Sequence, residues 1–148
     1  MATTIGTESS IQDLVTNLIY LEHDAIAAYD STIDKLEDPT SKTEISRFRD
    51  DHQRHLAELN KMAGMLGIQA PAMGDVKQML TTGKIALASL MGDSTILGAM
   101  KTNEDDTVAA YERASTHADA APESKKYFAD FAADERRHRA WMERAAAA

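Results

Sequence analysis

The sequence predicts an all-α protein, an antiparallel four-helix bundle with a long connection between its second and third helices. Apolar residues recur with the 3.6-residue period of an amphipathic helix, and no convincing alternating strand pattern occurs. Short breaks near Pro39 and Pro122 predict two helical hairpins. The stretch from Gly67 to Asp93 is long enough to return along the helices, so the second and third helices are expected to be parallel.

The first hairpin is predicted from two amphipathic segments. The first helix is expected from about 9 to 36, and a capping box that begins at Ser9 supports its start. The second helix is expected from about 41 to 65, with a similar capping box at Ser41. Gly67 is well placed to end it, because glycine adopts the left-handed conformation that commonly follows a helix.

The rest of the chain predicts a short helix and the second hairpin. Apolar spacing favours a short extra helix at about 76–91, inside the long connection. The third helix is expected at about 93–117, with Asp93 as its N-cap. The fourth is expected at about 122–144, beginning near Pro122, and the alanine-rich tail after it is expected to fray.

Composition narrows the class of protein. A chain of 148 residues fits one domain, 1–148, and a net charge of −8 without a basic stripe argues against nucleic-acid binding. No apolar run approaches a membrane span, and no export signal is recognised at the N-terminus. The absence of cysteine excludes disulfides and thiolate ligands and fits a cytoplasmic protein. A homodimer is the expected assembly, since symmetric dimers are the commonest oligomers.

The two predicted hairpins resemble each other in sequence. "LEHDAIAAYD" aligns with "NEDDTVAAYE", which places Glu22 on Glu104, and "FRDDHQRH" aligns with "FAADERRH", which places His55 on His138. The two alignments are offset by nearly the same number of residues, so the repeat predicts a pseudo-twofold relation between the hairpins. One position departs from the repeat, because His52 aligns with Glu135.

Ionisable residues interrupt the apolar face of all four long helices. Burying them without compensation would cost several kcal/mol per charge, so a bound cation is expected among them. Carboxylates with imidazoles suit iron, manganese or zinc, and the i, i+3 spacing places two ligands on one helical face. The alternative is that they are ordinary surface charges, assigned to the apolar face only because the helix boundaries are placed wrongly. The predicted metal ligands are Glu22, His52, His55, Glu104, Glu135 and His138.

With these residues in place, the chain resembles the ferritin-like superfamily of di-iron carboxylate proteins, most closely its bacterioferritin and rubrerythrin branch. The family pattern is a glutamate on the first and third helices and Glu-x-x-His on the second and fourth. The resemblance implies two metal ions, iron first, with Glu22 and Glu104 as terminal ligands and Glu135 as a bridge. His52 stands where the family has its second bridging glutamate.

Four further residues follow from the same resemblance. Asp51 and Asp134 precede the two ligand motifs, and they are expected to hold the ligand histidines in position. Tyr29 and Tyr111 are expected near the metals as hydrogen-bond donors or one-electron donors; ordinary aromatic packing is the alternative.

The substitution at position 52 leaves three outcomes open. His52 is an extra terminal ligand of a site with one bridge, or it turns away and leaves one metal weakly held, or the site holds one metal or prefers zinc or manganese. Three carboxylates also leave one positive charge of two divalent ions without a partner. A different frame of the second helix, in which Asp51 would be a metal ligand, is less favoured. Asp51 aligns with Asp134 in the repeat, and that match would then have no explanation.

Three functions follow as hypotheses. The first is a non-haem di-iron oxidoreductase of ferroxidase or peroxidase type, with ferrous iron and O₂ or peroxide as its partners. The second is a metal-binding or iron-sequestering protein with little turnover. The third is a structural or stress-related helical bundle that keeps only the outline of the site. The lack of cysteine excludes an attached rubredoxin-type electron donor, as in a true rubrerythrin.

Overall fold

The protein is all-helical in the residues that its computed structural model describes, 3–72 and 79–148, which confirms the all-α part of the prediction. Within these ranges, no helix is both long and apolar enough to cross a membrane. The helices are α1 (Ile11–Lys35), α2 (Pro39–Met65), α3 (Lys84–Ala88), α4 (Asp93–Ala114) and α5 (Pro122–Ala147).

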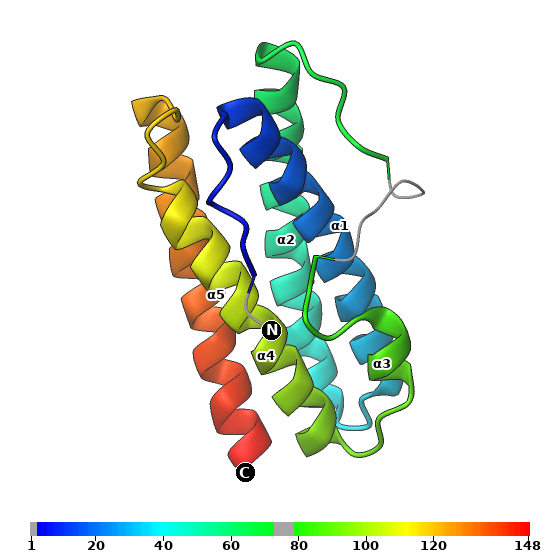
Figure 1. The fold of residues 1–148 in the computed structure, drawn as a ribbon. Coiled ribbons are helices and arrows are strands. Elements are labelled where there is room, and N and C mark those ends of the chain that lie inside the picture. Colours follow the sequence, from blue (N-terminus) through cyan, green and yellow to red (C-terminus); the bar gives the residue numbers. More distant parts are fainter. Residues whose placement is uncertain (1–2, 73–78) are drawn as a thin grey trace.

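The four long helices lie side by side (Figure 1). α1 packs most extensively against α2, and α4 against α5, and each of these pairs is antiparallel. α2 ends at the opposite end of the molecule from the start of α4, so these two helices run in the same direction. The long connection therefore brings the chain back along the helices, as its length predicts.

The first two helices begin at caps that differ from the predicted ones. Ser10 caps α1, and Ser9 precedes it. Asp38 caps α2, and its carboxylate accepts a hydrogen bond from the Ser41 backbone N–H at 3.0 Å. The predictions at Ser9 and Ser41 are therefore wrong by one and three residues. Pro39 explains the earlier start of α2, because proline has the helical φ angle and needs no N–H partner in the first turn.

The extra helix in the connection is shorter than predicted. Within the described part of the expected range, 79–91, only α3 is helical, and its N-cap Gly83 has an extended backbone. The described residues 79–83 form turns or irregular structure, and the first part of the range lies outside the described residues.

Side chains of α4 account for this difference. The Thr81 backbone N–H donates to Asp106 at 2.8 Å, and the Thr82 N–H donates to the Asn103 side-chain oxygen at 2.8 Å. The Asn103 amide in turn donates to the Thr82 carbonyl at 2.9 Å. These contacts satisfy backbone groups that helical bonds would otherwise satisfy, and they fasten the connection to α4.

Replacing Asn103 with alanine is expected to lower the free energy of unfolding by about 1–3 kcal/mol, because two partly buried hydrogen bonds are lost. Urea denaturation measures this change. Thr102→Ala is the matched control, since the Thr102 side chain is exposed and bonds only within its own helix, to Gly98. Equal stabilities of the two variants would contradict the role given to Asn103.

The start of α4 also connects two parts of the chain. Gly92 is the N-cap, with a φ of 87° that favours glycine. Asp93, predicted as the N-cap, is the first helical residue instead. Its carboxylate accepts the backbone N–H groups of Glu37 and Asp38 at 2.9 and 3.0 Å. This contact joins the turn between α1 and α2 to the start of α4.

The ends of the second hairpin differ slightly from prediction. α4 ends at Ala114 and not near 117, and α5 continues as helix to Ala147, beyond the predicted end near 144. The alanine-rich tail is therefore helical, as the high helix propensity of alanine allows.

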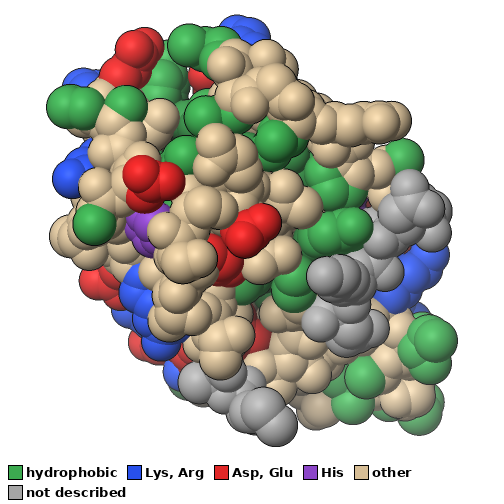
Figure 2. Space-filling model, turned by 45° about the horizontal axis from the view of Figure 1, so that its top comes forward, with side chains coloured by type: hydrophobic (Ala, Val, Ile, Leu, Met, Phe, Trp, Pro, Cys, Tyr) green, Lys and Arg blue, Asp and Glu red, His purple; other side chains and the backbone are tan. Residues whose placement is uncertain are grey.

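An apolar core surrounds the middle of the four long helices. Its largest fully buried side chains include Tyr29, Tyr111, Phe48, Phe128 and Phe131. The histidines of α2 and α5 are enclosed in this core, and histidine is scarcely visible on the face shown in Figure 2. The core therefore holds polar groups at its centre, away from water.

Candidate metal centre

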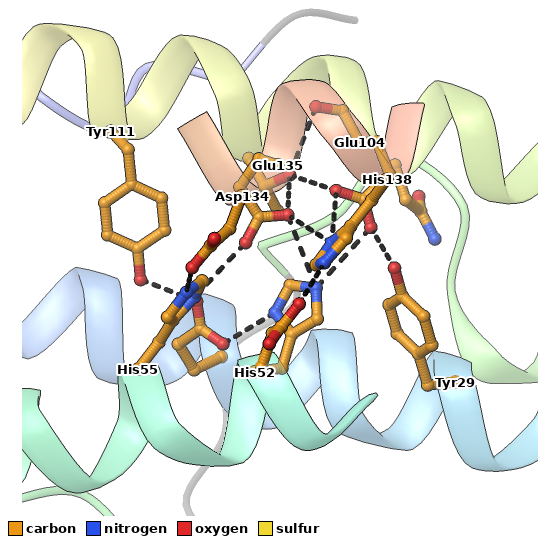
Figure 3. Close-up of polar contacts among 12 residues, drawn as sticks. Tyr29, His52, His55, Glu104, Tyr111, Asp134, Glu135 and His138 are labelled. Atoms are coloured by element: carbon orange, nitrogen blue, oxygen red, sulfur yellow. Dashed lines mark hydrogen bonds and ion pairs between the residues drawn. The ribbon is translucent and has the colours of Figure 1, made fainter. Parts of the chain in front are cut away.

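Six ionisable side chains meet in the middle of the molecule, and all four long helices contribute (Figure 3). Each is buried, with at most 1% of its surface exposed. Together they form two groups of potential metal ligands that share two members. The six are the predicted ligands Glu22, His52, His55, Glu104, Glu135 and His138.

The first group, called here the Glu22 group, consists of Glu22, His52, His55 and Glu135. His52 Nδ1 lies 2.7 Å from a Glu22 oxygen. His55 Nδ1 lies 3.2 Å from Glu135 Oε1 and 3.5 Å from Glu22 Oε1. One ligand atom from each residue lies within 4.8 Å of the others, so a single ion can contact all four.

The second group, the Glu104 group, consists of His52, Glu104, Glu135 and His138. His52 Nε2 lies 3.5 Å from Glu104 Oε1 and 3.4 Å from Glu135 Oε2. His138 Nδ1 lies 3.4 Å from the same Glu135 oxygen. Here too, one ligand atom from each residue lies within 4.8 Å of the others.

Four buried atoms of these groups have no hydrogen-bond partner among the described residues. An unpaired buried polar atom costs about 1–3 kcal/mol, so such atoms require an explanation. All four are of the atom types that bind iron, manganese and zinc, namely imidazole nitrogen and carboxylate oxygen, so they could serve as metal ligands. The residues present therefore fit a metal ion. The atoms are His52 Nε2, His55 Nδ1, His138 Nδ1 and Glu135 Oε1.

The two predicted supporting aspartates each contact a histidine on the opposite helix. His55 on α2 donates from Nε2 to Asp134 on α5 at 2.8 Å. His138 on α5 donates from Nε2 to Asp51 on α2 at 2.7 Å. Since Nε2 is held in both rings, Nδ1 is directed toward the site. A carboxylate in this position fixes the orientation and the tautomer of a ligand histidine.

Two arginines join these aspartates into one cluster. Arg54 contacts Asp51 at 2.8 Å and Asp134 at 3.0 Å, and Arg137 contacts the same two residues at 2.8 and 3.2 Å. Burial by itself raises the pKa of each aspartate, but the hydrogen bonds from histidine and arginine outweigh it. The pKa of Asp51 is lowered, and that of Asp134 falls to about 2. Both side chains therefore stay ionised as acceptors.

The predicted tyrosines contact the two glutamates that are not shared between the groups. The Tyr111 hydroxyl donates to Glu22 at 2.5 Å, and the Tyr29 hydroxyl donates to Glu104. Burial, together with these carboxylates, raises the pKa of both phenols well above its usual value. Both stay protonated at neutral pH, so each can orient its glutamate.

Sequence reasoning overlooked one residue of the site. Thr107 donates from its hydroxyl to Glu104 at 2.9 Å and lies 3.0 Å from Glu135. It follows Glu104 by three residues on α4 and lies on the same face. That spacing was the available signal, but threonine is common on buried helical faces and did not stand out.

The buried carboxylates differ in their affinity for protons. Burial raises the pKa of each, but the facing histidines lower that of Glu22 to about 2, and that of Glu104 also falls well below its usual value. The pKa of Glu135 is raised, by burial and by the charge of Glu104. Two adjacent carboxylates that repel each other favour a positive ion between them.

The three histidines hold protons strongly when no metal is bound. Burial by itself lowers the pKa of each imidazole, but the facing carboxylates outweigh it. The resulting pKa values are about 10 for His52, about 11 for His55 and about 12 for His138. A metal needs the unprotonated nitrogen, so metal ions and protons compete for these rings.

The stability of the metal-free protein is expected to fall as the pH rises above about 6.5, the ordinary pKa of histidine. The folded state keeps its imidazole protons up to about pH 10, whereas the unfolded state loses them near 6.5, so folding loses this stabilisation progressively across that interval. Thermal melting in chelator at pH 6.5 to 9 measures the effect. Metal-loaded protein is the control and should depend less on pH; a constant melting temperature without metal would contradict the prediction.

Comparison with known proteins identifies a family and a structural neighbour. The family model described as "Domain of unknown function (DUF2383)" matches residues 9–117, which include α1, α2 and α4 but not α5. The structure is similar to the crystal structure of a conserved hypothetical protein from Mycobacterium tuberculosis, with a TM-score of 0.75 at 13% identity. That alignment covers 93% of this chain and 91% of the other.

These comparisons bear on fold and family. At 13% identity, the structural neighbour supports the all-helical fold alone. No curated protein matches the sequence. The family match covers most of the chain, including four of the six site residues, while Glu135 and His138 on α5 lie beyond it. On this match, the chain belongs to the family described as "Domain of unknown function (DUF2383)".

Proposed function

We propose that this protein is a ferritin-like metal protein that holds two metal ions in its core, with iron as the expected metal, and that it oxidises ferrous iron or reduces O₂ or peroxide there. One observation carries the proposal. Four buried ligand atoms without hydrogen-bond partners, counted among the described residues, converge in two overlapping groups that each suit one ion.

The arrangement of the helices supports the same proposal. A glutamate from each of α1 and α4 faces His52 and His55 on α2 and Glu135 and His138 on α5. Parallel second and third long helices with one long connection are typical of ferritin-like proteins, as is a ligand set drawn from all four helices.

The residues around the site shield the ligand histidines from water and hold the ligand glutamates in position, which supports redox chemistry there. Bound iron would supply one-electron steps, so that two ferrous ions, each oxidised to ferric, could together reduce O₂ to hydrogen peroxide with the uptake of two protons. The aromatic rings of Phe48 and Phe131 stack on His138 and His55, at centroid distances of 4.3 and 4.0 Å, and exclude water from one side. Tyr29 and Tyr111 hold Glu104 and Glu22 in position through their hydroxyls.

Metal analysis of the purified protein, followed by addition of ferrous iron without oxygen and then admission of air, tests this function. Two irons per chain and a new near-ultraviolet absorption after air are expected, because oxidised iron bound to oxygen ligands absorbs there. Glu143→Gln is a matched control, since Glu143 is an exposed glutamate of α5 outside the site. Less than one metal per chain and no new absorption would contradict the proposal.

A second function is favoured by the raised pKa values of the histidines. Three protonated imidazoles and three carboxylates neutralise one another, so the core can persist as a set of ion pairs without metal. In that case the protein is a structural helical bundle. Thermal stability distinguishes the two, because bound metal stabilises the folded state of a metal protein and leaves a purely structural one unchanged.

The expected homodimer and cytoplasmic location stay predictions. Light scattering of the purified protein measures the first, and fractionation of the cells that produce it measures the second.

A further inference from the structure

We propose that His52 bridges the two metal ions, binding one ion through Nδ1 and the other through Nε2. This inference rests on the proposed two-metal centre and assigns a role to the one position that departs from the internal repeat. It differs from the other five ligands, because each ring nitrogen of His52 would serve a different ion.

The two ring nitrogens of His52 face different groups (Figure 3). Nδ1 lies 2.7 Å from Glu22, a residue found only in the Glu22 group. Nε2 lies 3.5 Å from Glu104, a residue found only in the Glu104 group, and it has no hydrogen-bond partner. The two sides of one ring therefore point into two ligand sets.

The His52 ring also lies at similar distances from the other two histidines. Its centroid is 5.6 Å from that of His55 and 5.4 Å from that of His138. Those two residues each belong to a single group, and an aspartate holds the outer nitrogen of each. The described structure shows no aspartate on His52; its second nitrogen faces ligands instead. His52 is thus placed between the groups, and the other two rings are placed at their outer sides.

Glu135 has the same spanning position on α5. Its Oε1 lies 3.2 Å from His55, and its Oε2 lies 3.4 Å from His138. Glu135 and His52 are the two members shared by both groups. The internal repeat aligns these two residues, so both halves of the repeat supply the shared ligand from the same helical position.

A bridging ring also resolves the charge of the centre. Three carboxylates leave one positive charge of two divalent ions without a partner. A ring that forms two metal–nitrogen bonds releases its N–H proton to solvent and carries one negative charge, with no change in oxidation state. Three carboxylates and one imidazolate then balance two divalent ions, as four carboxylates would.

The bridge has consequences for the metals that the site accepts. Metal–nitrogen bonds of about 2.0–2.1 Å on opposite sides of a ring hold two ions about 6 Å apart, compared with about 3.5–4 Å in compact two-metal sites. Ions that bind imidazole strongly, such as copper(II) and zinc, are favoured in such a site over manganese.

Copper(II) titration of the metal-free full-length chain tests the bridge. Wild-type protein should bind two coppers whose unpaired electrons couple through the shared ring, so that the paramagnetic resonance signal integrates to far less than two independent ions. Fewer than two bound coppers would contradict both the two-metal centre and the bridge. Two bound but uncoupled coppers would contradict the bridge alone.

Three matched variants make the test specific. His52→Gln should weaken the binding of both coppers by at least about 10-fold, the lower end of the loss caused by changing even a supporting residue, and any copper that still binds should give its full signal. His55→Gln should weaken only the copper of the Glu22 group, and His138→Gln only that of the Glu104 group. If His52→Gln weakens the binding of only one copper, His52 is a terminal ligand of that ion, and the proposal is overturned.

Discussion

Replacing Glu135 with glutamine is expected to weaken the binding of both metal ions strongly. Glu135 presents Oε1 to His55 and Oε2 to His138 and His52, so one side chain serves both groups. Glutamine has nearly the same shape, but it has no charge, and its amide nitrogen cannot bind a metal. Binding should weaken by more than about 100-fold at each group, which exceeds the loss seen when only a supporting residue is changed.

Isothermal titration with zinc or ferrous iron measures this loss, and circular dichroism checks that the variant is folded. Glu143→Gln is again the control, because it makes the same chemical change on the same helix at an exposed position. A Glu135→Gln protein that still binds two ions with wild-type affinity would show that Glu135 is not a shared ligand.

Replacing His52 with glutamate should lower the stability of the metal-free protein, so that the variant needs bound metal to reach the stability of the wild type. The metal-free core now pairs three histidines with three glutamates, and the variant would pair two with four. Carboxylates without a positive partner are then buried, and leaving a buried charge uncompensated costs roughly 3–5 kcal/mol. The variant without metal should therefore unfold at a much lower urea concentration than the wild type.

His52→Gln separates the effect of charge from the effect of shape, because it removes the imidazole without adding a carboxylate. Urea denaturation in chelator should rank the wild type first, His52→Gln second and His52→Glu last. Added ferrous iron or manganese should restore His52→Glu most, since metal that binds only the folded state stabilises it. Equal stability of the two variants without metal would contradict this account of the core.

The helical period and the internal repeat were sufficient to predict the polar centre. The i, i+3 pairs on α2 and α5 place their side chains on one face, and the matching of Glu22 with Glu104 relates the two hairpins. The structure brings all six predicted residues together in the core. Helical periodicity is sufficient here because every one of these residues lies near the middle of a long, regular helix.

Contacts between distant segments were beyond sequence reasoning. The short length of α3 depends on hydrogen bonds that backbone N–H groups of the connection donate to Asp106 and Asn103, which no local pattern indicates. The crossed pairing of Asp51 with His138 likewise depends on how α2 faces α5. The spanning position of His52 is a property of ring orientation, which residue identity alone does not determine.

The crossed aspartate–histidine pairs have a consequence for the exchange of metal. His55 is held by α5 and His138 is held by α2, so neither ring keeps its orientation if the two hairpins move apart. Each ligand group also takes residues from both hairpins. If the centre holds metal as proposed, we expect an ion to leave when the hairpins separate, so that the rate of metal release would measure how often the folded protein opens along the interface between α2 and α5.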